Sequence, residues 1–302
     1  MKRPKLSALD VLLRMDNSKR KFVFIILGGL LFFIFFAWSV VWDLNRPRFL
    51  EVNFFDVGQG DSAFIQTPQR QQVLIDGGPS SAVLEKLAKE MPFWDRTIDL
   101  IILTHPEKDH MSGLLDVLKR YKVENILWTG IYRDTPELKE WQRLIEEEGA
   151  KIKIAQSGQK IIFPEEKTEI DVLYPFEKLE GKEMKNSNDA SIISRIIFGE
   201  KSFLFTGDIS KTTEKKLLAK QIDIKSDVLK IAHHGSKTSN SEDFIKEVLP
   251  EIAVISVGKK NSYGHPSQET LDTLGKYGIS IFRTDINSDI KILCDSQSLK
   301  LK

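Results

Sequence analysis

The sequence predicts an α/β domain, an αββα sandwich of two packed sheets with helices on their outer faces, preceded by one transmembrane helix. Apolar runs of strand length alternate with segments of helical periodicity along residues 49–302. A charge-free run at residues 22–42 predicts the membrane helix. Polar clusters also recur where strands are expected to end, which places a site along one edge of the sheets. These clusters are Asp76, His105–His110, Asp208, His233–His234 and His265.

Composition suits one globular domain of about 250 residues with an appendage. The chain has 302 residues, of which 41% are hydrophobic and 29% are charged. The single cysteine, Cys294, excludes an intramolecular disulfide and a cysteine-rich zinc site, and we interpret it as a small buried hydrophobe. Residues 1–48 hold nine basic and three acidic residues, so the remainder has a net charge of about −5. This balance argues against a broad basic surface for nucleic acid.

Residues 1–21 form a basic segment and residues 22–42 a predicted anchor. The 21 uncharged residues span roughly 30 Å as a helix, and Trp38 and Trp42 lie near one end, as interfacial anchors do. The alternative is a cleaved signal peptide with a poor site at 37–39, but the apolar run is longer than a usual signal core. Basic residues before the run predict a cytoplasmic N-terminus. We therefore expect a single-pass protein of the cell membrane, with residues 49–302 outside the cytoplasm.

The first half of the domain follows the order strand, turn, strand, strand, helix, strand, helix, strand, helix. Gly58 and Gly60 relieve the backbone of a tight turn after the first strand. Thr135 and Pro136 suit the start of the third helix, and Gly149 suits its end. We predict strands at 50–56, 63–66, 72–75, 99–103 and 125–128, and helices at about 80–90, 112–120 and 136–148.

The second half continues with short strands, a polar loop and further helices. Ser241 is placed to cap a short helix. We predict strands at about 151–155, 160–163, 169–174, 192–198, 202–205, 227–231 and 252–256, helices at about 211–219 and 268–276, and two final strands. Residues 177–187 are predicted to be loop.

The stretch from residue 104 to 113 carries the densest set of metal-binding side chains. His105, Glu107, Asp109 and His110 lie within six residues, between a predicted buried strand and a predicted helix. We expect all four on the loop at the carboxyl end of that strand, because a loop can turn several donors toward one point. The chain has only five histidines, and all lie in polar loop segments. The pattern predicts a metal site.

At this point the sequence resembles the metallo-β-lactamase fold. The segment 105–110 is similar to that family's His-x-His-x-Asp-His signature, 76–78 to its Asp-Gly-Gly motif, and 206–208 to the motif with its bridging carboxylate. Segments 55–61, 229–236 and 263–266 resemble in particular the hydrolase domain of ComEC-type DNA-uptake proteins. The resemblance covers about residues 50–295. Those proteins also contain a membrane channel of many helices, whereas this chain has one hydrophobic segment and cannot form one.

The resemblance implies two divalent metal ions, Zn or Mn. His105 and Glu107 would bind one ion, Asp109 and His110 the other, and Asp208 would bridge them. Glu107 stands where many members have histidine, and this harder ligand shifts the preference toward Mn²⁺.

Either His233 or His234 would complete the second ion's ligands. Adjacent residues at a strand end point apart, so we expect one ligand and one neighbour and favour His234. His265 would line the site or reach the other ion.

Further polar residues are assigned to the surroundings of the ions. Asp76 would orient a ligand. Asp56 and Asp61 would brace the turn between them, and contact of either with the metal ligands is the alternative. Candidates for binding phosphate oxygens are Asn188, Ser236 and Lys237, although each also suits an ordinary role in a turn or at the surface.

The resemblance implies a nuclease or phosphodiesterase in which a metal pair offsets the charge that develops on phosphorus. The residues expected to take part directly are Asp109, Asp208, Asn188 and His265. Nucleic acid and a DNA-uptake machinery are the expected partners, and the oligomeric state stays open. The net acidic domain keeps a lactam, lactone or thioester hydrolase as an alternative. A non-catalytic, tethered binding module is a third class, and the nearly complete ligand set argues against it.

Overall fold

The structure, a computed structural model, describes residues 16–44, 49–163 and 168–302, in two compact units that divide after residue 47. The first unit contains helix α2 (Asn17–Leu44). Its stretch Asn17–Ser39 has a mean hydropathy of 2.5 and none of it is buried, so it is long and apolar enough to cross a bilayer. A signal sequence would share these properties. The helix contains the whole of the predicted 22–42 span, whereas most of the basic segment 1–21 lies outside the described residues.

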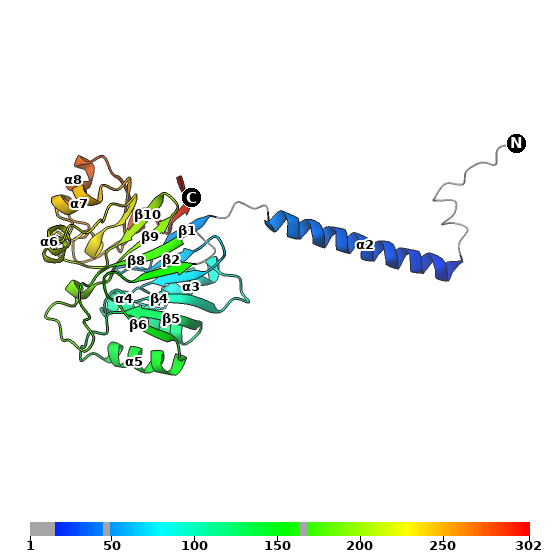
Figure 1. Cartoon of the computed structure of the whole chain (residues 1–302), viewed down its shortest axis with the longest axis horizontal. Coiled ribbons are helices and arrows are strands. Elements are labelled where there is room, and N and C mark those ends of the chain that lie inside the picture. Colours follow the sequence, from blue (N-terminus) through cyan, green and yellow to red (C-terminus); the bar gives the residue numbers. More distant parts are fainter. Residues whose placement is uncertain (1–15, 45–48, 164–167) are drawn as a thin grey trace. The chain divides into compact units, whose positions relative to one another are not determined.

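Two sheets form the centre of the second unit (Figure 1). Within the described residues, the first sheet has eight strands in the order β15-β14-β1-β2-β3-β4-β5-β6 and the second has seven in the order β13-β12-β11-β10-β9-β8-β7. The strands of the first sheet are β1 (Leu50–Phe54), β2 (Ala63–Gln66), β3 (Gln72–Ile75), β4 (Thr97–Ile102), β5 (Lys122–Trp128), β6 (Lys151–Ile154), β14 (Ile290–Cys294) and β15 (Leu299–Leu301). Those of the second are β7 (Lys160–Phe163), β8 (Thr168–Tyr174), β9 (Ile193–Phe198), β10 (Lys201–Phe205), β11 (Val228–Lys230), β12 (Ile252–Ile255) and β13 (Ser280–Arg283).

Helices cover the outer face of each sheet. Helices α3 (Ala82–Glu90), α4 (Lys108–Leu118) and α5 (Pro136–Glu148) pack on the first sheet, and α6 (Lys211–Ala219), α7 (Glu242–Val248) and α8 (Gln268–Lys276) on the second. Figure 1 shows α5 on one side of the two sheets and α6, α7 and α8 on the other. Three short helical segments complete the domain: η1 (Ser187–Ala190), η2 (Ala232–Gly235) and α9 (Thr284–Asn287). The arrangement confirms the predicted αββα sandwich.

Alternating side chains of the strands build the core between the sheets. Phe54 of β1 and Phe205 of β10 face each other across this layer with their rings stacked 5.6 Å apart. The residues between such positions point outward, where Phe64 of β2 packs against the α3–α5 layer and Leu204 of β10 against the α6–α8 layer. Cys294 is buried between the sheets as a small hydrophobe, as predicted.

Parallel strands bring the predicted polar clusters to one edge. β3, β4 and β5 are parallel neighbours in the first sheet, as are β10, β11 and β12 in the second. Their carboxyl ends therefore lie at the same edge of their sheet. The turn after β1 packs closely there: a Cβ on Gly60 would lie 2.2 Å from the carbonyl oxygen of Asp109, so only glycine fits.

Helix α4 begins at Lys108, four residues before the predicted start at 112. Asp109 and His110 therefore lie in its first turn, and the prediction that all four donors are on a loop was wrong. Glu107 precedes the helix in an extended conformation, and the acidic Asp109 suits the positive end of the helix dipole. The chain also ends with three strands, β13, β14 and β15, instead of the predicted two.

Candidate metal centre

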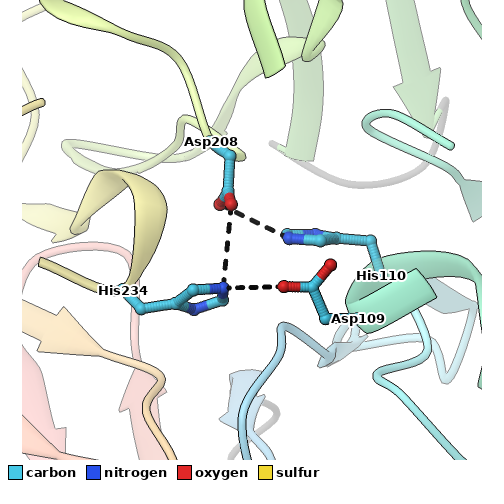
Figure 2. Close-up of side chains that lie close together, drawn as sticks. All are labelled: Asp109, His110, Asp208 and His234. Atoms are coloured by element: carbon cyan, nitrogen blue, oxygen red, sulfur yellow. Dashed lines mark hydrogen bonds and ion pairs between the residues drawn. The ribbon is translucent and has the colours of Figure 1, made fainter. Parts of the chain in front are cut away.

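Four side chains from both halves of the domain meet at this edge. Asp109 and His110 come from α4, Asp208 from the turn after β10, and His234 from η2 (Figure 2). One ligand atom from each lies within 4.8 Å of the others. His110 Nε2 is 3.4 Å from Asp208 Oδ1, and His234 Nε2 is 3.3 Å from Asp109 Oδ2 and 3.7 Å from Asp208 Oδ2. Two imidazoles and two carboxylates are a donor set that suits Zn²⁺ or Mn²⁺.

Several donor atoms in this cluster lack hydrogen-bond partners. His105 Nε2, His110 Nε2 and Asp208 Oδ1 are buried, and none of the described residues forms a hydrogen bond with them. The rings of His105 and His110 lie 4.2 Å apart, so His105 borders the four-residue cluster. His110 Nε2 and Asp208 Oδ1 have only each other, in an ion pair at 3.4 Å, whereas His105 Nε2 has no partner among the described residues. A buried polar atom without a partner costs about 1–3 kcal/mol. These atoms fit a site that binds a divalent metal ion.

Asp76 orients His110. Its Oδ2 accepts a hydrogen bond from His110 Nδ1 at 2.8 Å, and the backbone N–H and hydroxyl of Thr104 donate to its two oxygens at 2.8 and 2.7 Å. With Nδ1 held in this way, His110 presents Nε2 to the cluster. A carboxylate behind a histidine is the usual means of fixing the tautomer of a metal ligand.

His234 is oriented by two acceptors that the sequence did not identify as functional. Its Nδ1 lies 2.9 Å from the carbonyl oxygen of Ser256 and 3.2 Å from Asp61 Oδ1. Lys230, buried in β11, donates to Asp61 Oδ2 at 2.6 Å. The sequence predicts Asp61 mainly as a brace of the turn, with contact to the metal ligands as the alternative, and gives Lys230 no role. The only sequence signal for either was its place inside a segment that carried the resemblance.

The electrostatics of the cluster favour a cation. Burial opposes the charged form of His110, but the Asp208 and Asp76 carboxylates outweigh it and raise its pKa well above the usual range. Burial is likewise outweighed at His234, where Asp208 and Asp61 raise the pKa to about 10. For Asp208, burial is outweighed by His110 and His234, which hold its pKa well below the usual range. The two protonated imidazoles thus place positive charge beside the carboxylates of Asp109 and Asp208. One divalent ion could supply the same charge.

His105 differs, because burial and then the neighbouring His110 lower its pKa to about 3. It is therefore neutral at pH 7, with an unprotonated ring nitrogen available to bind a metal.

His233 and His234 do not point apart as expected. Their Nε2 atoms lie 3.8 and 3.7 Å from the same oxygen, Asp208 Oδ2. Both residues lie beyond the end of β11 with φ near 50°, in the left-handed region, so the alternation of a strand does not apply. Only His234 belongs to the four-residue cluster, and its side chain is 2% exposed against 29% for His233. The ring of His265 lies 5.6 Å from that of His233, beside the site.

Glu107 is not brought into the cluster. Its Oε1 forms a very short ion pair with Arg133 Nη1 and a very short hydrogen bond with the hydroxyl of Ser187 on η1. Arg133 precedes α5 and lies 26 residues after Glu107. The motif at residues 105–110 could not predict this pairing. The contacts give Glu107 the role of holding Arg133, and its assignment as a metal ligand stays a prediction.

The remaining candidates have contacts of their own or lie at the surface. Asp56 accepts a hydrogen bond from the backbone N–H of Gly58 at 3.2 Å, and so braces the turn. Ser236 is buried and its hydroxyl contacts that of Thr238 at 2.9 Å. Lys237 is exposed, and Asn188 is half-buried on η1 next to Ser187. The predicted phosphate-binding roles of Asn188, Ser236 and Lys237 stay predictions.

Comparison with known proteins agrees with this geometry. The sequence profile of the Metallo-beta-lactamase superfamily matches residues 55–259. ComE operon protein 3 of Bacillus subtilis is 33% identical over 258 residues, and Competence protein ComA of Neisseria gonorrhoeae is 31% identical over 244; each match covers 80% of this chain. This chain spans about a third, 32%, of the length of either relative. The metallo-beta-lactamase fold protein YhfI from Bacillus subtilis has a similar fold, with a TM-score of 0.55 at 14% identity, over 81% of this chain and 99% of that one.

Proposed function

The chain belongs to the metallo-beta-lactamase superfamily, and from this premise we propose that it is a metal-dependent phosphodiesterase that cleaves nucleic acid. The observation that carries the proposal is the cluster of Asp109, His110, Asp208 and His234, of which the last three are buried and two donor atoms lack a hydrogen bond. The choice of substrate is supported by the relative whose name refers to competence, a process that handles DNA.

The residues that would hold two divalent ions, Zn or Mn, are His105, Asp109, His110, Asp208 and His234. When bound, such ions lower the pKa of a water molecule and offset negative charge on a phosphate. The chain supports them by fixing each imidazole from behind, as described above for His110 and His234. Burial of His105, His110, Asp208 and His234 keeps bulk water from weakening these interactions.

We further propose that α2 anchors the protein in the cell membrane with the hydrolase domain, residues 49–302, outside the cytoplasm. The support is the apolar stretch of α2 and the basic residues that precede it, against only Arg46 and Arg48 after it. An external domain could act on incoming DNA together with an uptake machinery. Protease added to cells stripped of their wall should then digest the domain. Full protection, with a bright cytoplasm-only reporter fused to Lys302, would reverse the orientation, and a shortened mature chain would indicate a cleaved signal.

The activity is tested on the full-length chain in detergent, stripped with EDTA and reloaded with Mn²⁺ or Zn²⁺. We expect metal-dependent cleavage of single-stranded DNA, and its loss in Asp208→Asn. Asp243→Asn, an exposed carboxylate on α7, is the matched control and should keep full activity. Cleavage of nitrocefin but not of DNA or cyclic dinucleotides would favour the hydrolase alternative. Absence of both metal and hydrolysis would favour a binding module.

A further inference from the structure

An open cleft of about 450 Å³ adjoins the metal centre. Asp109, a member of the four-residue cluster, lies in its lining, so the cleft leads directly to the donor atoms. Arg133 and Tyr263 also line it. The volume falls within the usual range for small-molecule sites, about 300–1,000 Å³. The other lining residues are Gln59, Pro79, Pro106, Glu107, Lys108, Thr135 and Glu137.

Tyr263 presents an aromatic surface. The residue is 70% exposed, although its ring stacks on His265 with centroids 5.8 Å apart and planes inclined by 22°. The ring of His265 in turn lies 5.6 Å from that of His233, whose Nε2 is 3.8 Å from Asp208. A row of rings therefore runs outward from the metal centre and ends in an open aromatic face.

Arg133 is held in place by one nitrogen. Within the described part of the chain, all its hydrogen bonds run through Nη1, to Glu107, to the carbonyl oxygen of Pro106 and to the hydroxyl of Ser187. Its Nη2 and Nε remain for a ligand in the cleft. A guanidinium fixed in this way contacts a phosphate at little further cost in side-chain entropy.

The charges of the cleft do not amount to a basic surface. Glu107 pairs with Arg133, and Glu137 pairs with Lys108 at 2.8 Å, so both cations are already matched by carboxylates. Electrostatic attraction to a phosphate backbone is therefore weak outside the metal centre. A ligand must gain much of its affinity here from the aromatic face, which every nucleobase can use.

We propose that this cleft binds the nucleotide next to the cleaved phosphate, with its base stacked on Tyr263 and its phosphate in contact with Arg133. The inference rests on the proposed function and narrows it to unpaired strands. A base can stack on a protein ring only when it is free of its own duplex. The cleft would accept any base, because the ring of Tyr263 contacts the face of the base and not the edge that distinguishes one base from another.

The test compares binding of two single-stranded octamers to the full-length chain in EDTA and low salt, by fluorescence anisotropy. One carries thymine throughout and the other carries abasic sites on the same backbone. Wild type should prefer the thymine octamer, and Tyr263→Ala should reduce that preference by about 5- to 150-fold, the range for one stacked base. Tyr263→Phe and Tyr263→Trp should keep it. Arg133→Met should weaken both octamers alike, because they share the backbone.

Phe93→Ala is the control, because Phe93 is an 80% exposed aromatic outside the cleft lining, and it should leave both affinities unchanged. An unchanged preference in Tyr263→Ala, or equal loss in Tyr263→Phe, would overturn the stacking assignment. Cleavage is then measured with Mn²⁺ or Zn²⁺. A Tyr263-dependent preference without any cleavage would refute the proposed nuclease and leave the nucleotide-binding cleft standing.

Discussion

Replacing Asp76 with asparagine should remove metal by changing the tautomer of His110. Asp76 accepts three hydrogen bonds, from the Thr104 N–H, the Thr104 hydroxyl and His110 Nδ1. Asparagine has one oxygen, which can still serve the Thr104 N–H, and the hydroxyl can rotate. The amide NH₂ would then face His110 Nδ1, donor against donor. The imidazole can relieve this conflict by moving its proton to Nε2, the atom that faces the cluster.

The expected size of the effect follows from that blocked nitrogen. Loss of a partner behind a metal-binding histidine typically reduces metal affinity by about 10- to 100-fold. Because Asp76→Asn disables the ligand atom itself, we expect the upper end, about 100-fold or 2.8 kcal/mol. The fold should persist, since asparagine has the same shape. Competition of the purified protein with a chromogenic zinc chelator measures the affinity, and circular dichroism checks the fold.

Asp99→Asn is the matched control. Asp99 lies on β4 away from the metal centre and accepts a backbone hydrogen bond from Gln72 at 2.7 Å, which asparagine can also accept. It should leave metal affinity unchanged. Wild-type metal affinity in a folded Asp76→Asn protein would refute the proposed orientation of His110.

Four further predictions test the cluster. Asp109→Asn combined with His110→Ala should strip bound metal while the fold persists, and unchanged metal content by elemental analysis would rule out the assignment. His234→Ala should lose more metal than His233→Ala, because His234 lies in the cluster, and equal, negligible losses would remove the pair from the ligands. The pKa values of His110 and His234 are raised, so both rings carry protons at pH 7 that a metal must displace. Metal affinity should therefore fall as pH falls, and calorimetry should detect protons released on metal binding. A pH-independent metal affinity would contradict this. Glu107→Gln should retain metal, because its carboxylate contacts Arg133, and loss of metal would restore Glu107 as a ligand.

The sequence was sufficient for the sandwich because its signals are local. Strand-length apolar runs and caps such as Thr135, whose hydroxyl accepts from the Leu138 N–H at 3.3 Å, depend on neighbours in the chain. The predicted start of α4 was wrong because the local residues allow two conformations. Polar residues such as Lys108 and Asp109 suit a first helical turn as well as a loop, and the packing of the turn around Gly60 onto α4 decides between them.

Apart from Asp76, which the resemblance placed behind a ligand, the support of the metal centre could not be predicted, because its contacts join distant segments. Lys230 and Asp61 are 169 positions apart in the sequence. Their side chains come into contact only when β1 and β11 lie in facing sheets. Arg133 and Glu107 are similarly joined by the meeting of two loops. A single sequence contains all of these residues but does not show which of them will pair in the folded domain.

The origin of the donors links metal binding to the packing of the two sheets. Asp109 and His110 extend from the first sheet's layer, whereas Asp208 and His234 follow strands of the second. His234 and its neighbour both hold left-handed backbones, which cost about 1–3 kcal/mol each and persist only where the surroundings fix them. A metal bound by all four side chains would join the two layers and stabilise the strained segment. Ligand present at about 1,000 times its Kd stabilises a folded state by roughly 4 kcal/mol, so binding would offset strain of this order. The strained backbone of η2 is therefore best understood as part of the metal centre.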